Sequence, residues 1–393
     1  MIDVEDFMAR YHEIDNPYEF YDQMRSLDRV LWIPTLNRWL VTGHRQAMTL
    51  IRHEKTSSDR RNWADYQLPP GLDRPPGGMY ATDPPSHTRL RSLVQQAFTP
   101  KLVQRLRSGI EKLTDDLLTR AAEHGEIDLM AEIAYPLPAI VLAQLLGVPP
   151  EDHEQFRSWL TTFMDTFDPV SHRISSDVGA QAHADLERYL RRIVEERRQR
   201  PRDDLITGLV RAEEDGERLS GEELLEMCML LTVAGLETTA NLIGNGISAL
   251  FDHPDQMDRL RTHPELIETA VEELIRYDAP IQLSGRVVMD TIEIDGHVLR
   301  RGQMAGILLG AANRDPAAFD EPNHLDLGRR PNNHLGFGRG IHFCLGAPLA
   351  RLEGAITLTA LVTRFPKLRP AGDPKRRANV HVRGHASMPV AFT

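Results

Sequence analysis

Cysteine is scarce in this 393-residue sequence, which contains only Cys228 and Cys344. If Cys344 binds a metal, no disulfide bond can form within the chain, and this fits a reducing cytosol. The N-terminus lacks an apolar run, because residues 1–6 read Met-Ile-Asp-Val-Glu-Asp. We therefore expect neither a signal peptide nor a membrane anchor. Together these shortages predict a cytoplasmic protein.

Positive charge is also in deficit. The chain carries 46 Lys and Arg residues against 57 Asp and Glu residues, for a net charge of −11. This balance argues against nucleic acid as the main partner, although a local basic patch stays possible. No Ser/Gly linker, internal repeat or low-complexity tract divides the chain. We therefore expect one large domain over residues 1–393 rather than two or three smaller ones.

Cys344 lies near the end of a glycine-rich loop, residues 337–346, which reads Phe-Gly-Arg-Gly-Ile-His-Phe-Cys-Leu-Gly. Closely spaced glycines let the backbone pass near a flat or bulky partner. The apolar residues 347–350 predict a helix that begins just after the cysteine, and the partial positive charge of a helix N-terminus favours a thiolate. A single thiolate on such a platform suits an axial ligand of haem iron.

Other interpretations of this loop are weaker. A small buried hydrophobic cysteine explains neither the surrounding residues nor their spacing. A phosphate-binding loop needs a Lys-Ser/Thr pair that is absent, and the glycines do not fit a dinucleotide fingerprint. A nucleophilic cysteine stays open, although no local pattern supplies its base.

A long helix is predicted in the second half of the chain, because no proline occurs between residues 202 and 253. Ser220 and Glu223 form a capping box, so the helix should begin near Gly221 and run to about Phe251. Apolar residues on most of its sides predict that it passes through the middle of the molecule.

The centre of this helix, residues 234–239, reads Ala-Gly-Leu-Glu-Thr-Thr. A buried acid and two threonines are unusual in a helix interior, because the acid is costly to desolvate and threonine hydroxyls compete for backbone carbonyls. One interpretation is a packed kink with a salt-bridged acid. The other is a groove for O₂ with a proton-delivery pair, in which Thr238 faces the oxygen and Glu237 faces water or a salt bridge. Cys228, two turns earlier, is expected in the core.

Residues 337–346 resemble the haem-binding pattern Phe-Gly-x-Gly-x-His-x-Cys-x-Gly of the cytochrome P-450 family at every fixed position. Residues 234–239 resemble the oxygen-activation motif of the same family, with glutamate where some members have aspartate. The resemblance covers nearly the whole chain. It implies a soluble bacterial-type protein, mainly α-helical with small β-sheets, in a single domain built around the long central helix. It also implies haem b as cofactor, with Cys344 as the axial ligand.

Further residues gain roles from this resemblance. His87 and Arg91 stand four residues apart on a predicted helix and so share one face, where both can donate to carboxylates. The family's His-x-x-x-Arg pattern implies that they bind the haem propionates, and Arg286 and His342 are expected to do the same. Together with these four, the expected cofactor contacts are Cys344, Phe337 and Gly338.

Glu273 and Arg276 match the family's Glu-x-x-Arg motif, and Arg329 stands where its third member is expected. We expect this trio to hold the core beneath the cysteine loop without a part in the chemistry. On one helix alone, the first two would be a minor surface pair.

The substrate pocket is predicted only coarsely. A long loop, residues 61–85, carries large apolar side chains and is interpreted as a lid. Phe163 and Phe167 are as consistent with plain core as with pocket lining. A C-terminal hairpin of residues 380–384 and 388–390 is expected to close the pocket with its tip. The expected lining residues are Trp63, Tyr66, Met79, Phe163, Phe167, Val233, Ala234, Ile281 and Leu283.

The sequence therefore predicts a monooxygenase that uses O₂ to hydroxylate or epoxidise a medium-sized apolar molecule of bacterial secondary metabolism. No flavin or nicotinamide domain is present, so a ferredoxin and its reductase are expected to supply electrons. A peroxide-driven peroxygenase uses the same haem thiolate and is the nearest alternative. A non-catalytic haem-fold protein that recruits a partner is a further one, and the intact acid–alcohol pair argues against it.

Overall fold

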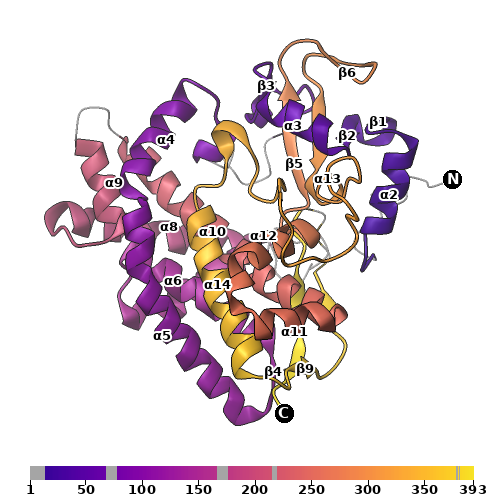
Figure 1. Cartoon of the computed structure of the whole chain (residues 1–393). Coiled ribbons are helices and arrows are strands. Elements are labelled where there is room, and N and C mark those ends of the chain that lie inside the picture. Colours follow the sequence, from indigo (N-terminus) through magenta and orange to yellow (C-terminus); the bar gives the residue numbers. More distant parts are fainter. Residues whose placement is uncertain (1–13, 68–77, 166–175, 215–218, 378, 380) are drawn as a thin grey trace.

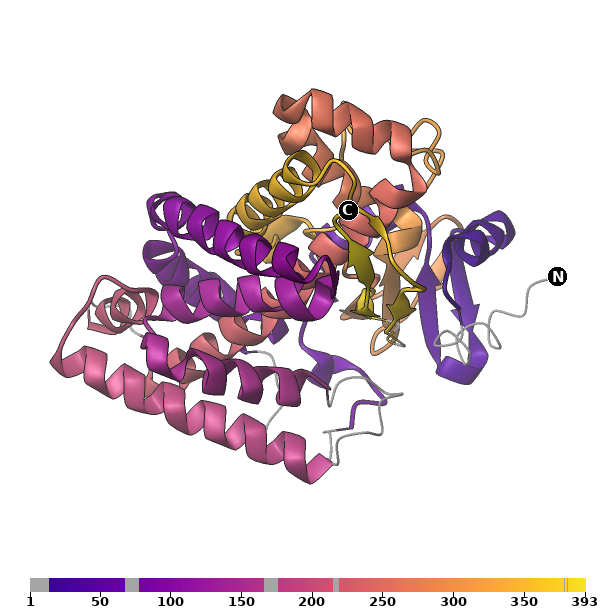
Figure 2. The same cartoon turned by 90° about the horizontal axis from the view of Figure 1, so that it is seen from below.

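The computed structural model describes residues 14–67, 78–165, 176–214, 219–377, 379 and 381–393. Helices make up most of the molecule, and strands β1, β2, β3 and β5 lie beside the N-terminal helices α2 and α3, whereas β4 and β9 lie near the C-terminus (Figure 1). Viewed from below, α5, α6 and α8 run on the opposite side (Figure 2). The predicted mainly α-helical fold with small sheets is confirmed.

The longer helices are α2 (Tyr18–Leu27), α3 (His44–Arg52), α4 (Ser86–Ala97), α5 (Pro100–His124), α6 (Pro136–Leu146), α7 (His153–Asp165), α8 (Ser176–Gln199), α9 (Leu205–Glu214), α10 (Gly221–Asp252), α11 (Pro254–Thr262), α12 (Ile267–Tyr277) and α14 (Ala347–Arg364). The strands are β1 (Val30–Ile33), β2 (Arg38–Val41), β3 (Thr56–Ser57), β4 (Glu126–Asp128), β5 (Leu283–Val288), β6 (Ile292–Ile294), β7 (His297–Leu299), β8 (Met304–Leu308), β9 (Arg369–Pro370), β10 (Lys375–Arg376), β11 (His385–Ser387) and β12 (Pro389–Ala391).

The central helix α10 begins at its predicted capping box, in which Ser220 Oγ accepts from the Glu223 amide and the Glu223 side chain accepts from the Ser220 amide. It packs against α6, α12 and α14, between two large hydrophobic clusters. At Gly235 a Cβ atom would lie 2.8 Å from Leu142 Cδ2, so α6 approaches this turn closely because glycine occupies it. Among the described residues, α10 is the one helix long and apolar enough to cross a membrane, and it is mostly buried in this core.

A five-stranded sheet of order β1-β2-β8-β5-β3 stands beside the helices. Strands β2 and β8 are parallel, and the other neighbours are antiparallel. Strand β5 carries Arg286 from this sheet toward the cysteine loop.

The predicted C-terminal hairpin is wrong in its pairing. Residues 388–390 do not pair with 380–384; instead β12 pairs with β4 and β9. The hairpin consists of β10 and β11, and an isolated bridge joins Val382 in its connection to Ile281. The sequence favours pairing of the two runs because they are adjacent, whereas β12 pairs with β4 from the first half of the chain and with β9, which precedes the hairpin.

Candidate functional site

The loop around Cys344 is closed by its own backbone. The Cys344 amide donates to the Phe337 carbonyl oxygen over 2.9 Å, which brings the two ends of the predicted motif together. Gly338 and Gly340 have φ angles of 67° and 71°, which side chains with a Cβ rarely adopt. Gly346 is the N-cap of α14, so Cys344 lies two residues before this N-cap, just ahead of the helix as the sequence predicts.

The thiol of Cys344 is surrounded by the groups that stabilise a thiolate, yet burial outweighs them. Burial raises the pKa of Cys344, while the backbone N–H groups of Gly346 and Ala347 and the charges of Arg91 and Arg351 lower it. The favourable groups anticipated from the sequence are present but do not suffice by themselves. A bound metal ion supplies the missing positive charge, because a coordinating thiol is deprotonated outright.

Four basic side chains from three separate segments gather near Cys344. The rings of His87, on α4, and His342, in the cysteine loop, have centroids 4.2 Å apart. Burial, together with the nearby positive charges of His87, Arg286 and Arg91, lowers the pKa of His342 to about 3. Burial also lowers the pKa of His87, with Arg91 adding to the effect. The structure thus brings together the four residues that the sequence assigned to the propionates.

These four residues need an anion. Within the described residues, none of them lies at ion-pair distance from a carboxylate, and both ring nitrogens of the buried His87 have no hydrogen-bond partner. Buried polar atoms are normally satisfied, so this arrangement is incomplete without a bound group. A cofactor with two carboxylates fits both the charge and the unpaired donors.

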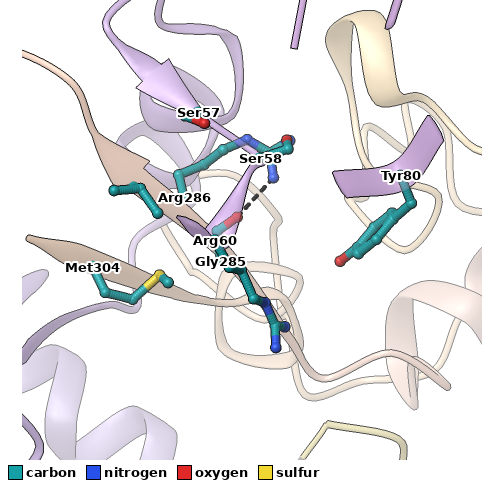
Figure 3. A pocket seen from close by; sticks show the side chains of 8 residues that line it. Ser57, Ser58, Arg60, Tyr80, Gly285, Arg286 and Met304 are labelled. Carbon is teal, nitrogen blue, oxygen red and sulfur yellow. Dashed lines mark hydrogen bonds between the residues drawn. The ribbon is translucent and has the colours of Figure 1, made fainter. Parts of the chain in front are cut away.

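Arg286 also borders a small cavity that is partly open to solvent (Figure 3). Its Nη1 donates to the neighbouring Gly285 carbonyl oxygen over 2.8 Å, and the residue is 7% exposed. In Figure 3 Tyr80 lies across the cavity from Met304 and the β5 strand. The cavity lining is polar on the Arg286 side, as expected beside a carboxylate site. It consists of Ser57, Ser58, Arg60, Tyr80, Gly285, Arg286, Val287 and Met304.

Glu237 and Thr238 point in different directions from α10. Glu237 is buried, and its Oε1 lies 3.8 Å from Arg377 Nη1, which agrees with the predicted salt bridge. Thr238 is partly exposed and its hydroxyl donates to the Ala234 carbonyl oxygen over 2.9 Å. The helix stays continuous through this stretch, so the structure shows no break at the motif.

The midpoint of α10 has an uncovered side. Ala234 is exposed and Val233, Gly235 and Thr238 are partly exposed, whereas residues 239–247 of this helix are all buried. A flat group would cover this side. The uncovered turn, the basic cluster and the cysteine loop therefore fit one planar, doubly anionic, thiolate-ligated cofactor.

The structural trio lies entirely in the core. Arg276 donates to both oxygens of Glu273 over 2.7 and 2.8 Å, and Arg329 Nε reaches the same oxygens at 3.0 and 3.1 Å. Both Glu273 and Arg276 have no exposed surface. Each arginine also donates to backbone carbonyls of residues 320–324, including His324, so the trio fixes the chain that leads to the cysteine loop. The minor surface pair considered above does not apply.

The predicted pocket residues differ in the contacts that they make. Trp63 lies beneath the Arg38 guanidinium at 5.3 Å, and Phe163 of α7 contacts His183 of α8 with ring centroids 4.7 Å apart. Leu283 packs in a core cluster with α2, and Met79 packs in the largest cluster. Phe167 lies outside the described residues.

Three further expected pocket residues, Tyr66, Val233 and Ile281, are partly buried. The hydroxyl of Tyr66 is buried without a partner among the residues that the structure describes. Ile281 forms the bridge to Val382, and Val233 packs at the edge of the largest cluster. Sequence reasoning missed Arg377, the partner of Glu237, because only the fold brings residues 140 positions apart together; a run of two arginines, Arg376 and Arg377, is the sole trace in the sequence.

Known proteins are similar to this chain in both fold and sequence. The family model for cytochrome P450 matches residues 38–383. The polyketide biosynthesis cytochrome P450 PksS of Bacillus subtilis is 41% identical over 369 residues, covering 91% of this chain and 90% of that protein. Its solved structure has a TM-score of 0.88 and covers 98% of both chains. The cytochrome P450 monooxygenase PikC of Streptomyces venezuelae is 38% identical, covering 96% of this chain and 91% of its own.

A solved structure of substrate-free CYP109E1 from Bacillus megaterium, at 35% identity, has a TM-score of 0.90 and covers 96% and 99% of the two chains. The fold and the haem-thiolate site thus define a haem-dependent oxygenase, and the chain belongs to the cytochrome P450 family. It is a cytochrome P450 monooxygenase with haem b as cofactor, and its relatives include enzymes of bacterial secondary metabolism.

Proposed function

We propose that this monooxygenase hydroxylates or epoxidises a medium-sized apolar metabolite, with electrons from a ferredoxin and its reductase, and that Cys344 is its axial haem ligand. The observation that carries the proposal is the unneutralised cluster of His87, Arg91, Arg286 and His342 beside the Cys344 loop. When bound, the haem activates O₂, so that one oxygen atom enters a C–H or C=C bond of the substrate and the other leaves as water.

The chain's own residues would position the cofactor and deliver protons. The basic cluster would hold the two carboxylates of the haem by charge-assisted hydrogen bonds. Phe337 stacks under Arg351, whose guanidinium carbon lies 4.5 Å from the ring centroid, and this aromatic wall supports the cysteine side of the loop. The glycine at 338 removes a Cβ from the surface that the cofactor would face.

Proton delivery falls to Glu237 and Thr238. The carboxyl of Glu237 exchanges protons with neighbouring water, and Arg377 holds it in place. The Thr238 hydroxyl, anchored to the Ala234 carbonyl, keeps its oxygen lone pairs available to accept a hydrogen bond from a water molecule.

The acid–alcohol pair separates this proposal from a peroxide-driven enzyme. In the Thr238→Ala variant, we expect turnover with NADPH, ferredoxin and reductase to release most reducing equivalents as hydrogen peroxide. Turnover supplied with hydrogen peroxide should change little, because that route needs no proton relay. Equal loss of both activities, with haem content intact, would contradict the assignment.

The substrate class rests on the relatives and the pocket. The name of PksS assigns it to polyketide biosynthesis, and PikC is named as a monooxygenase of Streptomyces venezuelae. We infer an apolar metabolite of this kind as the substrate of this chain. Partial exposure of Trp63, Tyr66 and Phe163 supports an apolar entrance. We further infer that residues 1–393 act as one catalytic domain. We also infer a reducing cytoplasm as its location, because neither cysteine forms a disulfide bond.

The ferredoxin surface is proposed on the side of α5 and the cysteine loop. Arg105 and Arg107 are about half exposed and make surface pairs with Asp203 and Glu111, at 2.6 and 3.6 Å. Such pairs are weak and exchange readily for a partner's carboxylates. Arg351 is held more firmly, by two hydrogen bonds to Glu272, and is a less available contact.

Charge reversal tests this surface. In the double variant Arg105→Glu/Arg107→Glu, the rate of haem reduction by an acidic ferredoxin should fall, and the loss should shrink at high salt. An unchanged rate at low salt would exclude this surface. Dithionite reduction, which needs no docking, serves as the control.

A further inference from the structure

A stripe of polar residues runs along one face of the otherwise apolar helix α10. Glu237, Asn241 and Asn245 are spaced at four-residue intervals, so their side chains follow one another along the helix. This face packs against strand β11 and the residue before it. A Cβ at Gly384 would overlap the Asn241 amide, so this amide lies directly against the hairpin backbone.

His385 occupies the next position on the same contact. A Cβ at Gly244 would lie 3.7 Å from His385 Cδ2, which places the imidazole ring over Gly244, one turn beyond Asn241. Both Asn241 and His385 have no exposed surface. The ring and the amide therefore both lie buried between α10 and the hairpin.

Four polar atoms in this space have no partner. Asn241 Oδ1 and Nδ2 and His385 Nδ1 and Nε2 are all buried and make no hydrogen bond within the described part of the chain. An unsatisfied buried polar atom destabilises the fold, and buried water usually satisfies groups of this kind. Asn245, one turn further along, is fully used by Asp278, Arg383 and Arg376, so the deficit is local.

The imidazole of His385 is neutral in this setting. Burial and the charges of Arg376 and Arg383 outweigh the opposing effects of Asp278 and Asp128, and the pKa of His385 is lowered to about 3. A neutral imidazole has one donor and one acceptor nitrogen, so it can bind water on both sides. The amide of Asn241 likewise both donates and accepts.

We propose that Asn241 and His385 hold a chain of internal water molecules that carries protons to Glu237. Both are positioning residues, and the inference rests on the proposed role of Glu237 in proton delivery. A proton that leaves the Glu237 carboxyl is replaced from the adjoining water, which takes one from the next molecule, and solvent supplies the last. The exposed Lys375 marks where the hairpin meets solvent.

The water itself is the first test, and it needs no turnover. A high-resolution crystal structure of the haem-loaded wild-type enzyme should show at least two ordered waters that hydrogen-bond to the Asn241 amide and the His385 ring. A dry space, with the two side chains bonded to each other or to nothing, would overturn the proposal.

The second test measures proton delivery. The haem-loaded enzyme consumes O₂ without added substrate, driven by NADPH through a plant ferredoxin and its reductase, in H₂O and in D₂O. Asn241→Leu and His385→Leu should each lower the share of O₂ reduced to water rather than hydrogen peroxide several-fold, and should enlarge the solvent isotope effect. His385→Gln, which still binds water, should restore both values.

Controls separate the possible failures. Thr114→Val removes another buried hydroxyl without a described partner, on α5, and should change neither value. If Glu237→Gln leaves the water share unchanged, the proposed role of Glu237 itself is wrong. If Glu237→Gln lowers it while both leucine variants match the wild type, only the water chain is excluded. The wild-type crystal structure decides the case if a leucine variant does not fold.

Discussion

Glu353 provides a sharp test of the packing around the cysteine-bearing helix. It lies on α14, nine residues after Cys344, and is 2% exposed. Its Oε2 atom is buried and has no hydrogen-bond partner within the described ranges. Burial raises the pKa of this carboxyl from 4.5 to about 8, so it is protonated in the folded protein at neutral pH.

The sign and size of its effect follow from linkage. Between pH 4.5 and pH 8 the unfolded chain releases the Glu353 proton and the folded chain keeps it. The free energy of unfolding therefore falls as pH rises, by about 1.4 kcal/mol per pH unit. From pH 5.5 to pH 7.5 the loss is about 2 to 3 kcal/mol. Below pH 4.5 both states hold the proton and the effect disappears.

The Glu353→Gln variant isolates the contribution of Glu353 to this pH dependence, because an amide does not titrate in that range. Urea unfolding of the haem-loaded wild type and variant, followed by far-UV circular dichroism at pH 5.5 and 7.5, gives the difference between the two pH dependences. The wild type should lose about 2 to 3 kcal/mol more than the variant over this range. Parallel pH dependences would show that the buried carboxyl has a partner or is hydrated, and would refute the reasoning.

Three other predictions concern the core and the cofactor. Replacing Glu273 with alanine leaves two buried arginines without their counter-ion and should cost about 3–5 kcal/mol, measured as lost soluble protein or a lowered melting temperature; an unchanged melting temperature would contradict the trio's structural role. Arg286→Ala should speed haem transfer to apomyoglobin, and an unaltered transfer rate would remove Arg286 from the propionate site. Gly235→Val should destabilise by about 1–3 kcal/mol, because its side chain would overlap Leu142, whereas a fully stable variant would show that α6 can move away.

Local patterns predicted much of the fold. The capping box and the absence of proline gave α10 to within one residue at either end, because both are short-range features. The loop of Cys344 was predicted for the same reason, since glycine spacing and the following apolar run determine its shape. Strand pairing at the C-terminus was not predictable, because β12 pairs with segments hundreds of residues away or on the other side of a turn.

The burial and the ion pairs of the charged residues could not be predicted without the three-dimensional fold. The spacing of Glu273 and Arg276 indicates a helix pair, but only tertiary packing buries it and adds Arg329. The sequence shows possible thiolate-stabilising groups around Cys344, whereas the balance between them and burial depends on the depth of the side chain. For the same reason the unsatisfied atoms of Asn241 and His385 leave no trace in the sequence.

Ligation of haem by Cys344 is the central claim, and one spectrum tests it most directly. The dithionite-reduced, carbon monoxide-bound protein should show the strongly red-shifted Soret band of a thiolate–iron–CO complex. The Cys344→Ala variant should lose that band, and the Cys228→Ala variant, which changes only a buried core thiol, should keep it. A Soret band typical of histidine ligation in the wild type, or a Cys344→Ala spectrum identical to it, would contradict the account.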